Sequence, residues 1–397
     1  MTGLEEVRLA RAAWSRLVEP GDVVAGALVA SLGPVEALAW LRSVAAEGAA
    51  GAPVAAGGLD GLVGTPASRR RLGVAVGRWA PRLATVDPAR ELRRVDALGG
   101  AVLIPEGPGW PGRVGDLGPS GPMCLWVRGR TDLDALTAPS VALVGARAST
   151  AYGDHVAGEL AAGLSTAGWT ILSGGAYGID AMAHRGALAT GGPTVAVLAG
   201  GVDRLYPAGN ARLLAALVEH GAVVSEVPPG SVPSRSRFLQ RNRVIAALGG
   251  ATVVVEAAWR SGALSTAGHA AELLRPVGAV PGPVTSAASA GCHRLLREGR
   301  AVCVTDAAEV IELVGPAAAG PAVRTHEARE VDGLTAEGRL VLDALPLRRG
   351  GELAHLARAA GLAEHEVLAE VGHLELAGLA ERDGPGWRRR RSPARGS

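Results

Sequence analysis

The first 85 residues carry apolar side chains at a spacing that predicts helices. Leu9, Trp14 and Leu17 recur at helical spacing, and Pro-Gly and Gly-Pro pairs interrupt the pattern further along. We therefore expect a small helical N-terminal domain over residues 1–85. Within it, residues 48–64 are rich in glycine and alanine, which is typical of a mobile loop.

From about residue 90 the apolar residues gather in short continuous runs separated by helical stretches. Strands that are apolar along their whole length are buried on both faces, which is typical of a parallel sheet between two helix layers. The pattern predicts an α/β domain over residues 86–315, with an extended, Rossmann-like, doubly wound and mostly parallel sheet. Two earlier runs, 102–104 and 125–127, predict an antiparallel extension. The strand candidates are 141–144, 170–173, 194–198, 222–225, 252–256 and 277–280, and helices are expected at 152–167, 180–190 and 210–220.

The last part of the chain predicts a third domain. A Pro/Ala/Gly-rich linker at 316–330 precedes residues 331–397, which show three short helical stretches and then a hairpin around Asp-Gly-Pro-Gly. Three helices followed by a hairpin are typical of a winged helix. The third helix carries four glutamates and no arginine, which opposes entry into a DNA groove and favours an accessory or protein-contact role. A basic tail at 388–391 either contacts phosphates or is simply solvated.

Composition narrows the possible functions. All 40 basic residues are arginine and 38 residues are acidic, so the net charge of +2 gives no overall field for nucleic acid, and local clusters must supply any such contact. Cys124, Cys292 and Cys303 form no CxxC pair, which argues for a reducing cytosol and against structural zinc. Because the chain shows no leader pattern and no apolar run of spanning length, we expect a soluble cytoplasmic protein without membrane insertion.

Glycine-rich turns follow the predicted strands at their carboxyl ends, the edge where open parallel sheets bind ligands. Bare backbone lets a phosphate approach closely, and the helix that follows offers amides to it. An arginine in the first turn is placed to hold that phosphate, although an ordinary turn with a surface arginine gives the same pattern. The candidate contacts in these turns are Gly145, Arg147, Ser149, Gly174, Gly175, Ser261 and Thr266.

Four polar residues beside these turns are expected to support the groove. Asp180 and Asn210 are placed to cap the helices that follow their strands. His184 lies one helical turn after Asp180, and Glu256 ends the fifth strand. We expect them to hold the loops through hydrogen bonds, with no catalytic residue among them.

The strongest local signal is a cluster of four arginines without an acid inside nine residues, around the only phenylalanine of the chain. Guanidinium groups contact phosphates, and an aromatic ring stacks on an unpaired base with a gain of about 1–3 kcal/mol for any base. The cluster predicts an arginine-rich loop that binds a single strand; the alternative is a solvated loop with one buried ring. The candidate residues are Arg235, Arg237, Phe238, Arg241, Asn242 and Arg243.

Several motifs of catalysis are missing. The chain has no GxxxxGK[ST] loop for ATP, no HExxH or paired acids for a metal, and no GxSxG elbow. We therefore expect no cofactor, no metal and no enzymatic activity.

Taken together, the glycine turns and the arginine cluster resemble the signature of the DNA-processing A family, the DprA/Smf group, over about residues 104–314. The resemblance implies binding of single-stranded DNA without sequence preference, protection of that DNA, a homodimer formed through the Rossmann-like domain, and loading of the RecA recombinase in transformation or repair. It assigns a phosphate contact to Arg147 and the family's RNR element to 241–243. The stretches that carry it are VGARASTAYG, SGGAYGIDAMAH, AVLAGGVDRLYPAGN, VSEVPPG, FLQRNRVIAALGG, SGALSTA and VPGPV.

The resemblance extends to the flanking regions, and two residues depart from the family's pattern. The N-terminal helices are similar to the family's SAM or helix-hairpin-helix-like domain, and the C-terminal region is similar to its winged helix. Leu239 stands where the family usually has proline, and His293 where it usually has asparagine.

One enzyme class remains as an alternative. Glycine loops with Glu256 before SGALST are distantly similar to nucleotide phosphoribohydrolases of the lysine-decarboxylase-like group, in which a carboxylate assists glycosidic cleavage. Their PGGxGTxxE element is missing here, and the arginine cluster around Phe238 has no use in such an enzyme.

Overall fold

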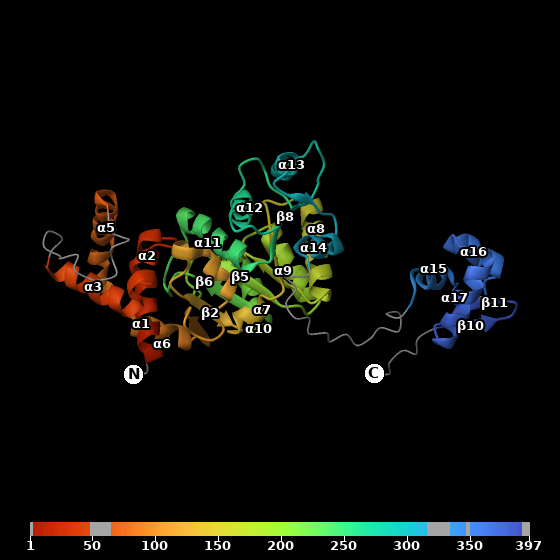
Figure 1. The fold of residues 1–397 in the computed structure, drawn as a ribbon, viewed down its shortest axis with the longest axis horizontal. Coiled ribbons are helices and arrows are strands. Elements are labelled where there is room, and N and C mark those ends of the chain that lie inside the picture. Colours follow the sequence, from red (N-terminus) through yellow and green to blue (C-terminus); the bar gives the residue numbers. More distant parts are fainter. Residues whose placement is uncertain (1–2, 48–64, 316–333, 347–349, 391–397) are drawn as a thin grey trace. The chain divides into compact units, whose positions relative to one another are not determined.

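The computed structural model describes residues 3–47, 65–315, 334–346 and 350–390 (Figure 1). The predicted loop at 48–64 and the predicted linker at 316–330 lie outside these residues. The chain divides into two compact units, Met1–Gly320 and Pro321–Ser397, and each is described by itself.

The first unit is built on a nine-stranded sheet in the order β1-β2-β6-β5-β4-β3-β7-β8-β9. Strands β3 to β9 pair in parallel, whereas β1 and β2 pair antiparallel to each other and β2 pairs antiparallel to β6. The predicted Rossmann-like sheet and its antiparallel extension are confirmed. The strands are β1 (Gly100–Leu103), β2 (Leu125–Gly129), β3 (Ser140–Val144), β4 (Thr170–Ser173), β5 (Thr194–Leu198), β6 (Ala222–Ser225), β7 (Ala251–Val254), β8 (Val277–Ala279) and β9 (Val302–Cys303).

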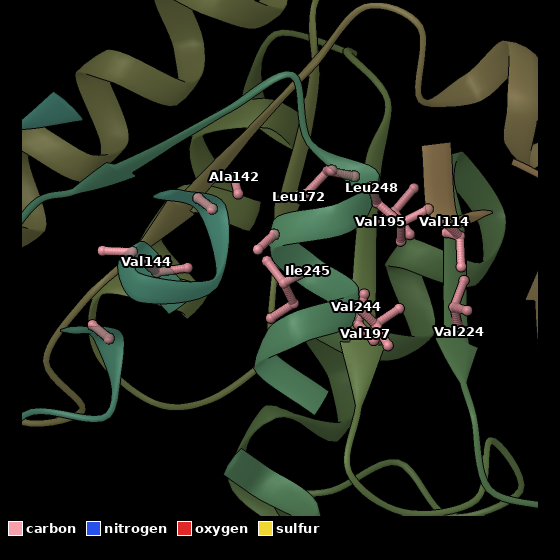
Figure 2. Packing of buried hydrophobic residues seen from close by; sticks show 14 of the residues in the cluster. Val114, Ala142, Val144, Leu172, Val195, Val197, Val224, Val244, Ile245 and Leu248 are labelled. Atoms are coloured by element: carbon pink, nitrogen blue, oxygen red, sulfur yellow. The ribbon is translucent and has the colours of Figure 1, made fainter. Parts of the chain in front are cut away.

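Helices cover both faces of this sheet. Alternate residues of a strand point to opposite faces, so each strand contributes apolar side chains to both helix layers. Ala142 and Val144 of β3 face one helix layer, and Val141 and Leu143 face the other. Figure 2 shows the first layer, where apolar side chains of α11 pack on the central strands. The helices of this domain are α6 (Pro88–Asp96), α7 (Leu133–Leu136), α8 (Ala151–Thr166), α9 (Ile179–Ala189), α10 (Ala211–His220), α11 (Arg235–Leu248), α12 (Ala263–Glu272), α13 (Ala290–Arg297) and α14 (Ala307–Val314), with 3-10 turns η2 (Gly112–Ser120), η3 (Ala208–Asn210) and η4 (Ala287–Ser289).

The order in which strands are added reverses at β3. Strands β4, β5 and β6 extend the sheet on one side of β3, and β7, β8 and β9 extend it on the other. Helix α8, which follows β3, packs on one face, whereas α12, which follows β7, packs on the opposite face. A crevice therefore opens between the carboxyl ends of β3 and β7, where folds of this kind bind their ligands.

The N-terminal segment is helical, as predicted, and has a core of its own within the first unit. The rings of Trp14 and Trp79 meet edge to face with centroids 5.6 Å apart. Both indole N–H groups are satisfied, by the carbonyl of Pro34 and the carboxylate of Asp22. The boundary at residue 85 stays a prediction. The elements are α1 (Gly3–Leu17), α2 (Val23–Leu32), α3 (Pro34–Glu47), α5 (Pro66–Trp79) and η1 (Ala80–Thr85).

The described residues of the second unit, 334–346 and 350–390, form three helices and a two-stranded hairpin, the elements that the sequence predicts. Its assignment as a winged helix stays a prediction. Arg388, expected in a basic tail, lies in the hairpin and pairs with Glu381 at 2.7 Å. The elements are α15 (Ala336–Ala344), α16 (Leu353–Ala360), α17 (Glu364–Leu376), β10 (Ala380–Asp383) and β11 (Gly386–Arg389).

No single helix in the described ranges is long and apolar enough to cross a bilayer. The helix pair Val23–Leu32 and Pro34–Ala46 passes on length and composition only when taken together, across a bend of 112°.

Candidate nucleic-acid interface

A cleft of about 710 Å³ opens at the reversal point of the sheet. Its walls come from the turn after β3, the amino-terminal half of α11 and the start of α12. Segments that are more than 100 residues apart in the chain thus meet at one sheet edge, as the glycine turns predicted. The structure brings together at this cleft the predicted residues Gly145, Arg147, Asp180, Arg235, Phe238, Arg241, Asn242, Ser261 and Thr266.

A smaller hollow of about 120 Å³ adjoins the cleft and shares Arg147 and Phe238 with it. The guanidinium carbon of Arg147 lies 4.4 Å from the centroid of the Phe238 ring. The ring of Tyr206 lies 6.2 Å from Phe238, and Tyr177 also lines the hollow. The Arg147–Phe238 pair therefore lines both hollows and forms the wall between them.

Three arginines at the cleft carry charge that the protein does not neutralise. Arg147, Arg235 and Arg260 are exposed and line the cleft. In the described part of the chain, no salt bridge joins any of the three to a carboxylate. Asp180 also lines the cleft but is buried, so the exposed charge there is positive. Exposed charge of one sign in a cleft concentrates the opposite charge, so the cleft attracts anions although the whole chain is nearly neutral.

Arg241 forms the floor of the cleft. Its side chain is buried, donates from Nη1 to the carbonyl of Val197 at 2.6 Å, and donates from Nε to Asn242 Oδ1 at 3.2 Å. Burial lowers the pKa of Arg241 to about 10; Asp180 opposes this shift and Arg147 adds to it. Arg241 is therefore charged at neutral pH, and its positive charge adds to that of the exposed arginines that line the cleft.

Gly174 lies where this buried guanidinium passes closest to the backbone. A methyl group at position 174 would overlap the Arg241 guanidinium. Gly174→Ala is therefore expected to push Arg241 from its bond with Val197 and to lower both the melting temperature and the affinity for a polyanion. Gly158→Ala is the matched control: it lies in α8 with open space around its Cβ, and alanine should stabilise the helix by about 0.5–1 kcal/mol. Thermal melts of both variants test this prediction. If Gly174→Ala melts at the same temperature as Gly158→Ala, the methyl group does not displace Arg241 from the carbonyl of Val197.

The amides at the start of α8 are occupied by the protein itself. The carboxylate of Glu256, at the end of β7, accepts from the Thr150 amide at 2.9 Å and from the Thr150 hydroxyl at 2.6 Å. Thr150 in turn caps the helix at Gly153, and a methyl group there would overlap Glu256. The expectation that this helix offers free amides to a phosphate is wrong for Thr150 and Gly153, because a buried carboxylate and a hydroxyl already occupy them.

The arginine cluster lies in a helix and not in a loop. Ser234 caps α11 by accepting from the Arg237 amide at 3.3 Å, and the residues that follow are mostly good helix formers. A helix turns about 100° per residue, so side chains close in sequence point in different directions. Arg235, Phe238, Arg241 and Asn242 line the cleft.

Arg237 and Arg243 point away from the cleft, toward the N-terminal helices. Arg237 pairs with Glu19 at 2.9 Å. Arg243 is buried and donates to both carboxylate oxygens of Glu226 at 2.5 Å, next to Gly21. Burial raises the pKa of Glu226, while Arg243 and the Gly21 amide oppose that shift. Arg237 therefore joins the helical segment to the sheet domain, and the Arg243–Glu226 pair lies within the sheet domain where Gly21 packs against it.

The predicted supporting residues hold the loops, although not as helix caps. Asp180 accepts from the amides of Gly174 at 3.1 Å and Ala176 at 3.4 Å. Asn210 donates to the carbonyls of Gly175 and Ala176 at 3.1 and 2.9 Å, and its side chain does not cap α10. Both side chains bond to the turn after β4 and neither caps a helix, so the cap expectation is wrong. That they support a DNA-binding groove stays a prediction.

His184 and Ser149 also make internal contacts. His184 Nδ1 lies 2.7 Å from the hydroxyl of Thr194, which ties α9 to β5. Burial, with a contribution from Arg241, lowers the pKa of His184 to about 3, so the ring is neutral. Ser149 donates to Asp154 at 2.5 Å at the start of α8. Ser149 and Gly175 do not line the cleft.

The structure describes both residues that depart from the family pattern, Leu239 and His293. Leu239 lies in α11, is 47% exposed and lines the cleft. His293 donates from Nε2 to the carbonyl of Gly282 at 3.0 Å, which fixes the turn after β8.

Four residues of the site were missed in the sequence: Tyr177, Arg204, Tyr206 and Arg260. All four lie in turns that follow strands of the sheet, where glycines and hydroxyl residues give the more obvious sequence signal. Arg260 directly precedes Ser261, so the position after a predicted strand was the signal available. Among the described residues no group of three or more His, Cys, Asp or Glu side chains could hold a metal ion.

Comparison with known proteins decides the family. The model of the family described as DNA recombination-mediator protein A matches residues 101–315. This chain belongs to that family, the DprA/Smf family. Its DprA/Smf relatives include a putative DNA processing protein DprA from Mycobacterium tuberculosis (strain CDC 1551 / Oshkosh), 42% identical over 385 residues, which are 94% of this chain and 92% of the relative.

Two further DprA/Smf proteins show how far the similarity extends. Protein Smf from Escherichia coli (strain K12) is 43% identical over 192 residues, 48% of this chain and 50% of Smf. The crystal structure of DprA from Streptococcus pneumoniae covers 77% of this chain and 96% of its own, with a TM-score of 0.59 and 28% identity. DprA/Smf proteins are named as DNA-processing proteins and not as enzymes, so the predicted family and the non-enzymatic class are confirmed.

Proposed function

We propose that the cleft at the reversal point of the sheet binds single-stranded DNA without sequence preference. The observation that carries this proposal is the Arg147–Phe238 pair at 4.4 Å in a cleft also lined by Arg235 and Arg260, neither of which has a carboxylate partner among the described residues. Exposed guanidinium groups contact phosphates, and a half-buried aromatic ring stacks on an unpaired base. A duplex keeps its bases stacked on one another, so this combination favours single strands.

The polar groups of the cleft support binding without sequence preference. Asn242 carries the only carboxamide among the residues that line the cleft. Its Nδ2 donates to the carbonyl of Gly262 at 3.2 Å, and its Oδ1 accepts from Arg241. Because these two bonds hold the amide within the protein, it has fewer free positions to offer a base edge, and contacts to phosphate and ring dominate.

We further propose that the bound strand is protected and passed to the RecA recombinase, in transformation or repair, by a homodimer formed through the sheet domain. The family's description as a recombination mediator supports this role. Sedimentation of the free protein tests the dimer, and the rate at which RecA nucleates on a coated strand tests the loading. The phosphoribohydrolase alternative needs a carboxylate free to assist cleavage, whereas Glu256 is engaged by Thr150.

Fluorescence anisotropy of labelled oligo-dT over a range of salt concentrations tests the binding itself. Three exposed guanidinium groups should give a slope of log K against log salt of about −2, since each phosphate contact on a single strand contributes about −0.7. Unlabelled duplex should compete poorly. Equal affinity for duplex, or no binding at low salt, would contradict the proposal.

A further inference from the structure

A second pair of an aromatic ring and a guanidinium lies beside the cleft. The indole of Trp259 is 51% exposed, and the guanidinium carbon of Arg294 lies 4.8 Å from its ring centroid. Trp259 directly precedes Arg260, which lines the cleft. Like Arg147 and Phe238, the pair combines an arginine with an aromatic ring. Its distance from guanidinium carbon to ring centroid is close to the 4.4 Å of that first pair.

Close backbone packing fixes this pair. The amide of Gly291, at the start of α13, donates to the carbonyl of Ala257 at 2.7 Å, and a methyl group at Gly291 would press on that residue and on the carbonyl of Ala258. Helix α13 is thereby held against the turn that carries Trp259. Arg294 Nη1 lies 3.5 Å from the Trp259 carbonyl. The guanidinium is therefore positioned over the ring before any ligand arrives.

The indole of this pair is open to solvent, and no carboxylate among the described residues neutralises the arginines beside it. All eight tryptophans lie within the described ranges, and Trp259 is the only one of them in the exposed class. No salt bridge in these ranges joins Arg294 or Arg297 to a carboxylate, and Arg294 Nε is buried without a hydrogen-bond partner. Arg297 is exposed one turn further along α13. An exposed indole beside two unneutralised cations is a surface that suits a polyanion with flat aromatic bases.

We propose that Trp259 and Arg294 form a second stacking platform, on which a base of single-stranded DNA lies after the strand has left the cleft past Arg260. Arg297 and the edge of the Arg294 guanidinium then meet the phosphates of this outer segment. The proposal rests on the function proposed above for the cleft. It predicts a strand path longer than the cleft, with one aromatic–guanidinium pair in the cleft wall and one outside.

Oligonucleotide length and tryptophan emission together test the platform. For oligo-dT of about 20 nucleotides, Trp259→Ala should weaken binding about tenfold, whereas for oligo-dT of about 5 nucleotides, confined to the cleft, the affinity should not change. Because Trp259 is the exposed indole, the long oligonucleotide should quench the emission of the wild-type protein, and Trp259→Phe should abolish this quenching. Arg300→Ala is the matched control, since Arg300 follows α13 but pairs with Glu298. A melting temperature equal to that of the wild type verifies folding of each variant.

The outcomes separate the platform from the cleft. Unchanged binding of the long oligonucleotide by Trp259→Ala, or quenching that persists in Trp259→Phe, overturns the platform while leaving the cleft intact. Failure of the wild-type protein to bind either oligonucleotide overturns the cleft itself. If Trp259→Ala binds DNA normally but fails to support RecA nucleation, the surface contacts a protein, and the platform is likewise overturned.

Discussion

Replacing Arg147 with alanine will weaken the binding of oligo-dT at least tenfold at low salt. Arg147 is exposed, lies over Phe238 and has no carboxylate partner among the described residues. A hydrogen bond between charged groups contributes about 1.5–3 kcal/mol, which sets the size of the loss. Losing one phosphate contact should also make the slope of log K against log salt less negative by about 0.7.

The control for this experiment is Arg130→Ala. Arg130 is also an exposed arginine, but it pairs with Asp132 at 2.5 Å and does not line the cleft. Its loss should change neither affinity nor salt dependence. If Arg147→Ala leaves both quantities at their wild-type values, the strand does not pass the wall between the two hollows.

Replacing Arg243 with alanine will destabilise the protein by about 3–5 kcal/mol and will leave the DNA affinity of the folded fraction unchanged. The substitution removes the partner of Glu226 and leaves a buried carboxylate without compensation, which costs this much in other buried pairs. Denaturant unfolding measures the loss as a lower midpoint at an unchanged slope.

Two further variants complete this test. Arg237→Ala breaks an exposed pair with Glu19 and should cost no more than about 1 kcal/mol. Substituting both Arg243 and Glu226 by methionine should restore most of the stability, since no buried charge is then left alone. A stable Arg243→Ala variant with weak DNA binding would return Arg243 to the interface, where its sequence motif had placed it.

The sheet could be predicted from sequence because its signal is local. Each central strand is a continuous apolar run, and glycine marks the turn after it, as at Gly145 and Gly174. Since the carboxyl ends of parallel strands share one edge, the approximate place of the cleft followed as well.

The long-range side-chain partners could not be predicted, because they are far apart in the chain. Glu256 meets Thr150 across 106 residues and Arg237 meets Glu19 across 218. The sequence shows four arginines together. It does not show that the helix turns Arg237 and Arg243 away from the cleft. Charge density was a poor guide for the same reason: Glu19 pairs with Arg237 from 218 residues away, whereas no salt bridge among the described residues reaches Arg260.

The occupied start of α8 bears on competition from mononucleotides. In dinucleotide-binding folds the amides of the first helix hold a nucleotide by its phosphates. Here Glu256 keeps the Thr150 amide engaged, so this helix start does not offer that amide to a free nucleotide, and the proposed binding rests on separate contacts along the cleft. A polymer joins many such contacts through one backbone, and each further contact forms at a high effective concentration. Selection for a strand over its monomers then arises from avidity, and it increases with the number of linked phosphates.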